Sequence, residues 1–338
     1  MSKTQNIQNK HTLDNIFDTE LVDGGTVNSA YAGVMFPVPE LHSLPQGITR
    51  QFLEDADEYD KKYTNLKYFR FLLDRAFPID KIDRRKPYTI LDLGAGSGNT
   101  TLPLLEMFPH ATIVATDLSP DLLAILRARL LSRSDLLTRT SFVCVDAMKD
   151  YLAEGAFDIV VGGAILHHLK SPEDALRMVY RTLQAGGLGL FFEPFENGNG
   201  LLRYVYERIL DDPRAASLPW NVADCLRRLS LDFKVRAGAD KSDPIFNLID
   251  DKWLFTRAYL ERVCREVGFS SVSIQALHQT DKAFRRQTEV YLRLAANAEP
   301  NQLPDWCWSL IDDLDNAFSV DAKQDFLIEG QIIVEKRI

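Results

Sequence analysis

The sequence predicts an α/β fold, a three-layer sandwich in which a mostly parallel β-sheet lies between two layers of helices. From residue 88 to 193, short apolar runs typical of buried strands alternate with segments that have a helical pattern. The run at 159–161 is apolar without interruption, as expected for a strand that is buried on both faces. The joins between these segments are short, which favours parallel strands connected by crossover helices.

The elements follow one another in a regular order. Residues 1–48 contain a cluster of prolines and are expected to be irregular, and a helical pattern then runs from 49 to 77. The strands and helices expected after it are 88–93, 99–108, 112–116, 120–133, 141–145, a short helix at 149–153, and 158–161. The next helix has Ser171 as its N-cap and ends at Gly186-Gly187, and a strand follows at 188–193.

One domain is expected over 49–338, with helical, lid-like insertions at about 197–251 and 281–318. The alternation resumes between them with a helix at 256–267 and a strand at 271–276, and a last strand is expected at 330–335. The segment Asn197-Gly-Asn-Gly200 is interpreted as a flexible joint. The sequence does not decide whether the insertions cover a substrate or form the interface of a homodimer.

The bulk properties exclude several classes of protein. The net charge of −9 argues against a nucleic-acid-binding surface. The four cysteines are far apart, with no spacing typical of a metal site, so we expect reduced thiols in a cytoplasmic protein and no bound metal. No apolar run is long enough to span a membrane, and residues 1–12 do not form a signal peptide.

A glycine-rich loop follows the strand at 88–93. Gly94, Gly96 and Gly98 let the backbone turn sharply and approach a ligand closely, and the next helix offers its free N–H groups. This arrangement predicts a nucleoside site at the carboxyl edge of the sheet. The spacing is one residue tighter than the dinucleotide fingerprint, although a dehydrogenase remains an alternative.

Two acidic residues end the following strands. Asp117 can accept both hydrogen bonds of a ribose diol, and Asp146 with Ala147 can meet an adenine edge. The strand at 158–161 then runs into Gly162-Gly-Ala-Ile-Leu-His-His-Leu169.

Together and in this order, these motifs resemble the class I S-adenosylmethionine-dependent methyltransferases, closely over about 55–195. The resemblance rests on Leu91-Asp-Leu-Gly-Ala-Gly-Ser-Gly98, Asp117, Asp146, Phe157-Asp-Ile-Val-Val161, Leu166-His-His-Leu169 and Leu183-Gln-Ala-Gly-Gly187. It implies a seven-stranded sheet whose last strand is antiparallel, and S-adenosylmethionine as the cofactor.

The resemblance also implies roles for single residues. Gly94, Ala95 and Gly96 would line the methionine part of the cofactor, and Asp92 would hold its amino group. Asp117 would bind the ribose, Leu118 would pack on the adenine, and Asp146 and Ala147 would flank it. Gly163 and Ala164 would pass beneath the sulfonium, and Tyr59 and Tyr63 belong to a helix that closes over the cofactor.

The candidate catalytic residues are His167, His168 and Glu193. Methylation of a hydroxyl benefits from a base whose pKa is near neutral, and histidine suits that task. Because neighbouring side chains of an extended chain point in opposite directions, one histidine is expected to face the site and the other to be structural. Glu193, on the same edge of the sheet, would orient the histidine, bind a polar group or amine of the substrate, or form part of the scaffold.

The expected function is methylation of a small molecule, with a hydroxyl of a secondary metabolite or sugar as the favoured acceptor. The alternatives are N- or C-methylation of a small molecule, and a protein that binds S-adenosylmethionine without catalysis. Neither a nucleic acid nor a membrane is an expected partner.

Overall fold

The computed structural model describes residues 13–41, 55–77, 82–277 and 281–337. Seven strands form the main sheet, and they lie in the order β5-β4-β3-β6-β7-β9-β8. Their bounds are β3 (Thr89–Leu93), β4 (Thr112–Asp117), β5 (Thr140–Cys144), β6 (Phe157–Gly163), β7 (Leu183–Pro194), β8 (Ser271–Ala276) and β9 (Glu329–Glu335). β9 is antiparallel to both of its neighbours, whereas β3 to β7 are parallel to one another.

The expected count of seven strands is wrong, because two short strands extend the sheet at its β5 edge. β1 (Leu21–Asp23) and β2 (Met35–Pro37) form an antiparallel pair, and β2 pairs with β5 through Met35 and Val143. The sheet therefore has nine strands within the described residues. Strands of three residues are too short to show alternation in a sequence, so this segment was expected to be irregular. Residues 1–12 and 42–48 of that segment lie outside the described residues.

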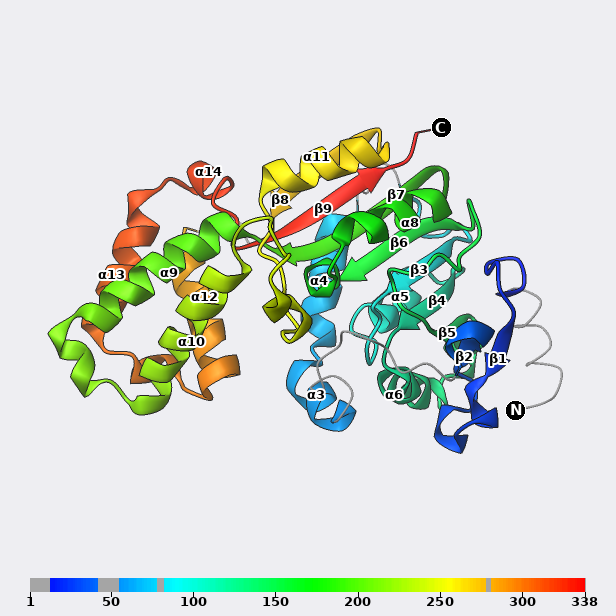
Figure 1. Ribbon diagram of the computed structural model, residues 1–338, viewed down its shortest axis with the longest axis horizontal. Coiled ribbons are helices and arrows are strands. Elements are labelled where there is room, and N and C mark those ends of the chain that lie inside the picture. Colours follow the sequence, from blue (N-terminus) through cyan, green and yellow to red (C-terminus); the bar gives the residue numbers. More distant parts are fainter. Residues whose placement is uncertain (1–12, 42–54, 78–81, 278–280, 338) are drawn as a thin grey trace.

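Two layers of helices cover the sheet (Figure 1). α4 (Leu66–Ala76), α5 (Thr101–Met107) and α6 (Pro120–Leu130) pack on one face, where Leu104 and Leu126 share a core with Ile113. α8 (Pro172–Thr182) and α11 (Arg257–Val267) pack on the other, where Leu176 and Val160 lie in a second core. Alternate residues of each strand serve these two cores, which is why the strands are apolar throughout.

The two expected insertions combine into one helical body. It consists of α9 (Glu196–Asp211), α10 (Trp220–Arg236), α12 (Ala283–Ala296) and α13 (Asp305–Ala317). These helices bury a third core of their own, which includes Tyr206, Leu226 and Phe284. Since α9 starts directly after β7, the body lies at the carboxyl edge of the parallel strands, on the left of Figure 1.

Several local expectations are wrong for physical reasons. No helix forms at 149–153, because the backbone of Leu152 pairs with Phe17 instead. α8 ends at Thr182, and Gly186 lies within β7, where its N–H donates to the carbonyl of Lys336 at 3.0 Å.

The helix expected at 49–77 is two helices within the described residues, α3 (Ala56–Tyr63) and α4, separated at Asn65, which caps α4.

The segment 197–200 is not a flexible joint but the first turn of α9. The buried side chain of Asn199 donates to the carbonyls of Phe195 and Ile328, at 2.7 and 2.9 Å. A methyl group on Gly198 would lie 2.5 Å from the carbonyl oxygen of Leu327. The turn is therefore fixed against the chain that leads into β9.

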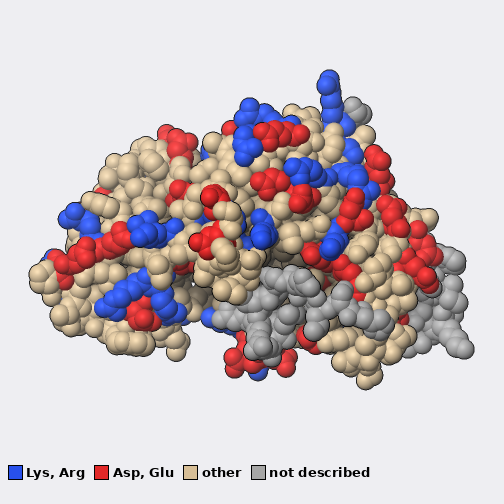
Figure 2. Space-filling view, in the orientation of Figure 1, with Lys and Arg blue, Asp and Glu red and all other residues tan. Residues whose placement is uncertain are grey.

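The surface carries charged side chains of both signs (Figure 2). Figure 2 shows Lys and Arg interspersed with Asp and Glu over this face of the molecule. The four cysteines are buried and free. None of the helices in the described ranges has the length and apolar character that crossing a bilayer requires.

Candidate active site

The glycine loop has the backbone that the sequence predicts. Gly94, Gly96 and Gly98 have φ values of 71°, 53° and 105°, in the region that favours glycine. The N–H of Ala95 donates to the carbonyl of Thr116 at 2.8 Å, which fixes the loop to the end of β4. No atom lies within 4 Å of the place where a Cβ on Gly96 would stand, so this part of the loop borders open space that a ligand can enter.

Asp92 lies beneath this loop and is fully buried. Its carboxylate accepts hydrogen bonds from the hydroxyl groups of Thr100, at 2.7 Å, and Thr101. Burial raises the pKa of Asp92 to about 6, although the two threonine hydroxyls oppose that shift. In this structure Asp92 joins β3 to the start of α5, and the expected contact with the cofactor's amino group stays a prediction.

Asp117 stands beside the loop at the end of β4. Its two carboxylate oxygens accept from the N–H groups of Gly96 and Ser119, each at 2.8 Å. Burial raises the pKa of this carboxyl, while these backbone donors and the nearby ring of His168 lower it. Leu118, the next residue, is partly exposed. A carboxylate beside an open glycine loop suits the recognition of a ribose diol.

The remaining predicted cofactor residues end two other strands. After β5, Asp146 accepts from the N–H of Met148 at 2.9 Å, and Ala147 packs against the core. At the end of β6, a Cβ on Gly163 would lie 2.6 Å from the side chain of Thr100. Ala164 has a φ of 64°, which is rare for a residue with a side chain. The carboxyl ends of β3, β4, β5 and β6 therefore meet at one edge.

Helix α3 stands over the glycine loop. The side chain of Asn99 in the loop donates to the carbonyl of Tyr63 at 3.0 Å. Arg129 of α6 donates to the carbonyl of Ser97 at 2.7 Å and pairs with Asp60 of α3 at 2.5 Å.

These contacts bring the tyrosines of α3 to the site. The rings of Tyr59 and Tyr63 lie 4.8 Å apart. Burial raises the pKa of Tyr59, and the charges of Asp117 and Asp251 raise it further. The charges of both strand-end and insertion carboxylates thus act on the tyrosine that α3 brings to the glycine loop.

Glu193 holds His167 in place. The two residues are buried, and the Nδ1 of His167 lies 2.6 Å from a carboxylate oxygen of Glu193. The same carboxylate accepts from the N–H groups of Ile165, Leu166 and His167, at 3.1, 2.8 and 3.2 Å. These donors begin the 3₁₀ turn at Leu166–His168, so Glu193 both caps the turn and orients the imidazole.

Both histidines face the same carboxylate. Asp251 places one oxygen 3.5 Å from the Nε2 of His167 and 3.1 Å from the Nδ1 of His168. The two rings lie with their centres 4.0 Å apart and an angle of 40° between them. The expectation that they point in opposite directions is wrong, because the chain here is a 3₁₀ turn and not extended.

Charge is concentrated around this group. Burial lowers the pKa of His167, but the carboxylates of Glu193 and Asp251 outweigh it and raise that pKa to about 9. Burial alone would raise the pKa of Asp251, yet the two histidines and Arg236 hold it well below its usual range. We call His167, His168 and Asp251 the histidine cluster.

Arg236 supports the cluster from the end of α10. It is buried, and its guanidinium lies 3.3 Å from Asp251 and 2.9 Å from Asp232. The same group donates to the carbonyl of Trp253 at 3.0 Å. Sequence reasoning missed Asp251 and Arg236, because both lie in the insertion, far along the chain from the strand-end motifs. The only local signal was a pair of acids, at 250–251, in a mostly apolar stretch.

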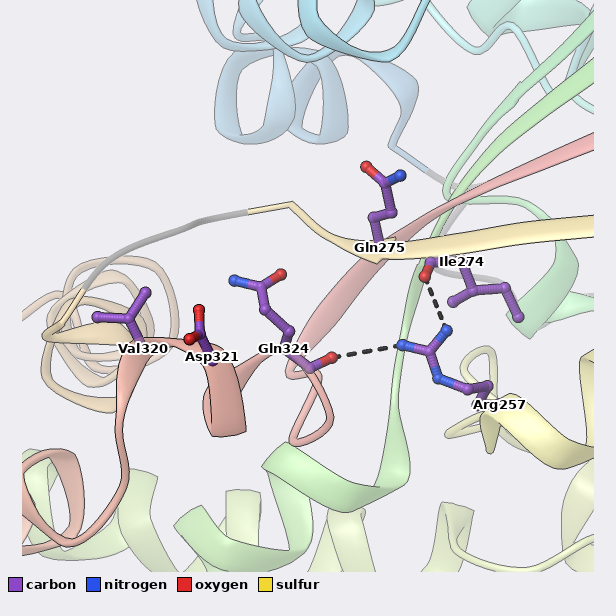
Figure 3. Close-up of a pocket in the computed structure, with 6 residues that line it drawn as sticks. All are labelled: Arg257, Ile274, Gln275, Val320, Asp321 and Gln324. Atoms are coloured by element: carbon purple, nitrogen blue, oxygen red, sulfur yellow. Dashed lines mark hydrogen bonds between the residues drawn. The ribbon is translucent and has the colours of Figure 1, made fainter.

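Two surface cavities lie outside this group of residues. One, of about 390 Å³, lies between β8 and α14 (Val320–Lys323), and Figure 3 shows Arg257 at its side. Arg257 donates to the carbonyls of Ile274 and Gln324, at 2.8 and 3.3 Å, so it fastens α11 to its neighbours. The other cavity, of about 350 Å³, lies at the start of α9 beside Phe233.

Comparison with known proteins gives consistent similarities. A family model described as a methyltransferase domain matches residues 90–187. The chain is 32% identical over 163 residues to demethylmenaquinone methyltransferase of Thermus thermophilus. This alignment covers 47% of this chain and 73% of that protein. It is 30% identical over 196 residues to a ubiquinone/menaquinone biosynthesis C-methyltransferase of Ectopseudomonas mendocina, covering 57% of this chain and 76% of that one.

A solved structure supports the fold. The phosphoethanolamine N-methyltransferase 2 of Haemonchus contortus, in complex with phosphomonomethylethanolamine and S-adenosylhomocysteine, superposes with a TM-score of 0.53 at 16% identity. The superposition covers 90% of this chain and 62% of that one. At this identity the similarity concerns the fold alone.

Proposed function

This chain belongs to the class I S-adenosylmethionine-dependent methyltransferases and acts on a small molecule, and we propose that its acceptor group is an ionisable hydroxyl. These similarities to methyltransferases overturn the alternative in which the glycine loop belongs to a dehydrogenase. The observation that carries the proposal is the histidine cluster, because it gathers two imidazoles and a carboxylate at the edge of the sheet where the glycine loop also ends.

The cofactor side of the site is built from the loop and the acids beside it. Bound S-adenosylmethionine supplies a methyl group that its sulfonium already activates. The open space at Gly96 suits the methionine part and the carboxylate of Asp117 suits the ribose, and α3 with Tyr59, fastened to the loop through Asn99, would cover the cofactor. The protein's contribution is mainly to align the acceptor with this methyl group and to exclude water.

The acceptor side needs a group that handles a proton. A neutral hydroxyl is a poor nucleophile, so its proton must leave as the oxygen reacts. We assign this proton removal to the histidine cluster, because His168 lies 3.1 Å from the carboxylate of Asp251 and follows β6 at the sheet edge where β4 ends in Asp117. Glu193 and Arg236 act as positioning residues, which hold His167 and Asp251.

C-methylation of a phenol or enol is a second candidate. One of the similar proteins is named as a C-methyltransferase of ubiquinone and menaquinone biosynthesis. In such an acceptor, loss of the hydroxyl proton moves electron density to the carbon that attacks, so the same cluster would serve. The proposed acceptor class is therefore an acidic hydroxyl, and the atom that receives the methyl group depends on the acceptor.

We assign the helical body the role of covering this acceptor. α10 leads into the segment 237–253, which carries Asp251 to the two histidines. An interface between two copies of the chain is the alternative. The exposed side chains of Trp220 and Leu231 on α10 support that alternative, which sedimentation velocity tests.

Methyl transfer from labelled S-adenosylmethionine to a panel of phenols, enols, sugars, carboxylates and amines tests the proposal. We expect turnover with acidic hydroxyl compounds, and NMR of the product identifies O- or C-methylation. His168→Ala and Asp251→Asn should lower kcat by about 10²–10⁴, as expected when proton removal is lost, with little change in S-adenosylhomocysteine affinity. His110→Ala, which removes an exposed histidine, serves as the matched control.

Three outcomes would contradict the proposal. One is full turnover in both variants, and the second is methylation confined to amines. The third is binding of the cofactor with no transfer to any member of the panel, which would favour a binding protein without catalysis.

A further inference from the structure

The histidine cluster also has the composition of a metal site. His167, His168 and Asp251 offer one donor atom each, and the three atoms lie within 4.8 Å of one another. Two imidazoles and a carboxylate suit zinc and similar divalent transition metals. Catalytic zinc sites have three such protein ligands and leave a fourth position for water or substrate.

The spacing of the donor atoms fits a tetrahedral ion. With metal–ligand distances of about 2.0–2.1 Å, two ligands of a tetrahedron stand about 3.3 Å apart. The oxygen of Asp251 lies 3.5 Å from the Nε2 of His167 and 3.1 Å from the Nδ1 of His168. The third pair, the donor nitrogens of the two histidines, lies within 4.8 Å, so these nitrogens would move toward each other by up to about 1.5 Å when an ion binds.

The residues behind the donors are those that a metal site requires. A ligating histidine usually donates its other ring N–H to a carboxylate, which fixes the ring and its tautomer. Glu193 provides this contact to the Nδ1 of His167 at 2.6 Å. Arg236 lies 3.3 Å from the second oxygen of Asp251, so one oxygen stays directed at the histidines.

The charges around the cluster also favour a cation. Three carboxylates, those of Glu193, Asp251 and Asp232, lie around the two imidazoles, and Arg236 is the guanidinium among them. A divalent ion would add positive charge beside these carboxylates in a partly buried site. The site is more than a surface cluster of acids. Glu193 and Asp251 both contact the histidines directly, so the four side chains form one connected unit.

We propose that His167, His168 and Asp251 bind a divalent transition-metal ion of the zinc type, with open positions for the acceptor's oxygen. With the ion bound, the three donor atoms hold the metal instead of accepting the proton. An acceptor hydroxyl bound at an open position would be made more acidic by the ion and would lose its proton to water. That last step rests on the proposed function, whereas the binding of the ion does not. The expectation of no bound metal depended on the wide spacing of the four cysteines, whereas the proposed ligands are two adjacent histidines and an aspartate from a distant segment.

Metal binding to the full chain, stripped with a chelator and then dialysed, tests the inference without turnover. We expect one equivalent of Zn²⁺ at micromolar or lower Kd, measured by competition with a chromophoric chelator. Asp251→Asn and His168→Ala should lose this affinity, and Glu193→Gln should weaken it by about 10–100-fold through the orientation of His167. His110→Ala should bind zinc like the wild type.

The absorption of cobalt(II) provides a test that needs no variant. We expect the intense visible bands of a four-coordinate ion in the wild-type protein. Weak bands typical of six-coordinate cobalt, absence of one-to-one zinc binding, or unchanged affinity in Asp251→Asn would each overturn the inference. Methyl transfer by the chelator-treated protein at its full rate would overturn the role of the ion while leaving the proposed function intact.

Discussion

At the scale of single residues, the site depends on buried or partly buried carboxylates that are held by hydrogen bonds. Asp92, Asp117 and Glu193 each lie at or near the end of a strand. Asp92 accepts from the start of the next helix, whereas Asp117 and Glu193 accept from the turns that follow neighbouring strands. Sequence patterns located all three. What the sequence could not show is the partner of each carboxylate, because the partners come from other turns and helices that only the fold brings near.

The pKa of Asp92 predicts a pH-dependent difference in stability. Its folded value of about 6 lies above the unfolded value of about 3.9, so its stabilising contribution is full below about 3.9 and is lost as the pH rises through 6. The unfolding free energy of the wild type relative to Asp92→Asn should fall by about 1.4 kcal/mol between pH 5 and 7.5. Denaturant unfolding at several pH values measures it, with the exposed Asp135→Asn as control. A flat or rising difference would contradict the assignment.

The open space beside Gly96 predicts that an alanine there weakens ligand binding in a protein that still folds. Gly96→Ala costs about 1–2 kcal/mol for its positive φ, but the methyl group meets no neighbour and the protein should fold. That methyl group would stand in the space assigned to the cofactor, so S-adenosylhomocysteine should bind at least tenfold more weakly by calorimetry. Gly238→Ala is the matched control, because Gly238 also has a positive φ and open surroundings. Equal affinity in both variants would remove the loop from the cofactor site.

At the scale of elements, the strands and their helices follow from the sequence, whereas the start of the helical body does not. Two glycines and two asparagines at 197–200 favour a turn by their intrinsic propensity. The structure has a helix there, because Asn199 satisfies two backbone carbonyls and Gly198 allows α9 to pack closely on the chain before β9. Tertiary packing overrides local propensity at this point.

The two glycines of this turn predict opposite effects. Gly198→Ala would press a methyl group against the backbone of Leu327 and Ile328, at 2.5 and 2.6 Å, and should destabilise the protein by about 1–3 kcal/mol. Gly200→Ala meets no neighbour in the same helix and should stabilise it by about 0.5–1 kcal/mol. Thermal or denaturant unfolding of the pair measures both. The same sign for both substitutions would refute a fixed helical turn.

At the scale of the whole molecule, the segments that border the site differ in how extensively they pack against the rest of the protein. The sheet and the helical body each have a buried core, whereas α3 has no buried residue and is held through Asn99 and Arg129. The segment 237–253 is fastened to the sheet by Asp251 and by Trp253, whose indole donates to Leu169 at 2.9 Å. These two segments are the parts that border the proposed ligands.

This arrangement predicts where ligands slow hydrogen exchange. Saturation with S-adenosylhomocysteine should protect α3, because a bound ligand adds contacts to a helix with few of its own. Protection should extend to 237–253 when an acceptor is also present, while α13 in the helical body should change little. Mass spectrometry of exchanged peptides measures each segment. Protection spread evenly over α3 and α13 would argue against α3 as the cover of the cofactor.

The sequence by itself determined the alternating sheet, the glycine loop and the acids at its strand ends, because each depends on residues that lie close together in the chain. Burial on two faces makes a strand apolar, and a sharp turn needs glycine, so both leave a local pattern. Only the tertiary structure decided the nine-strand count, the single helical body and the meeting of Asp251 and Arg236 with the two histidines. Those features depend on contacts between distant segments, which no local pattern records.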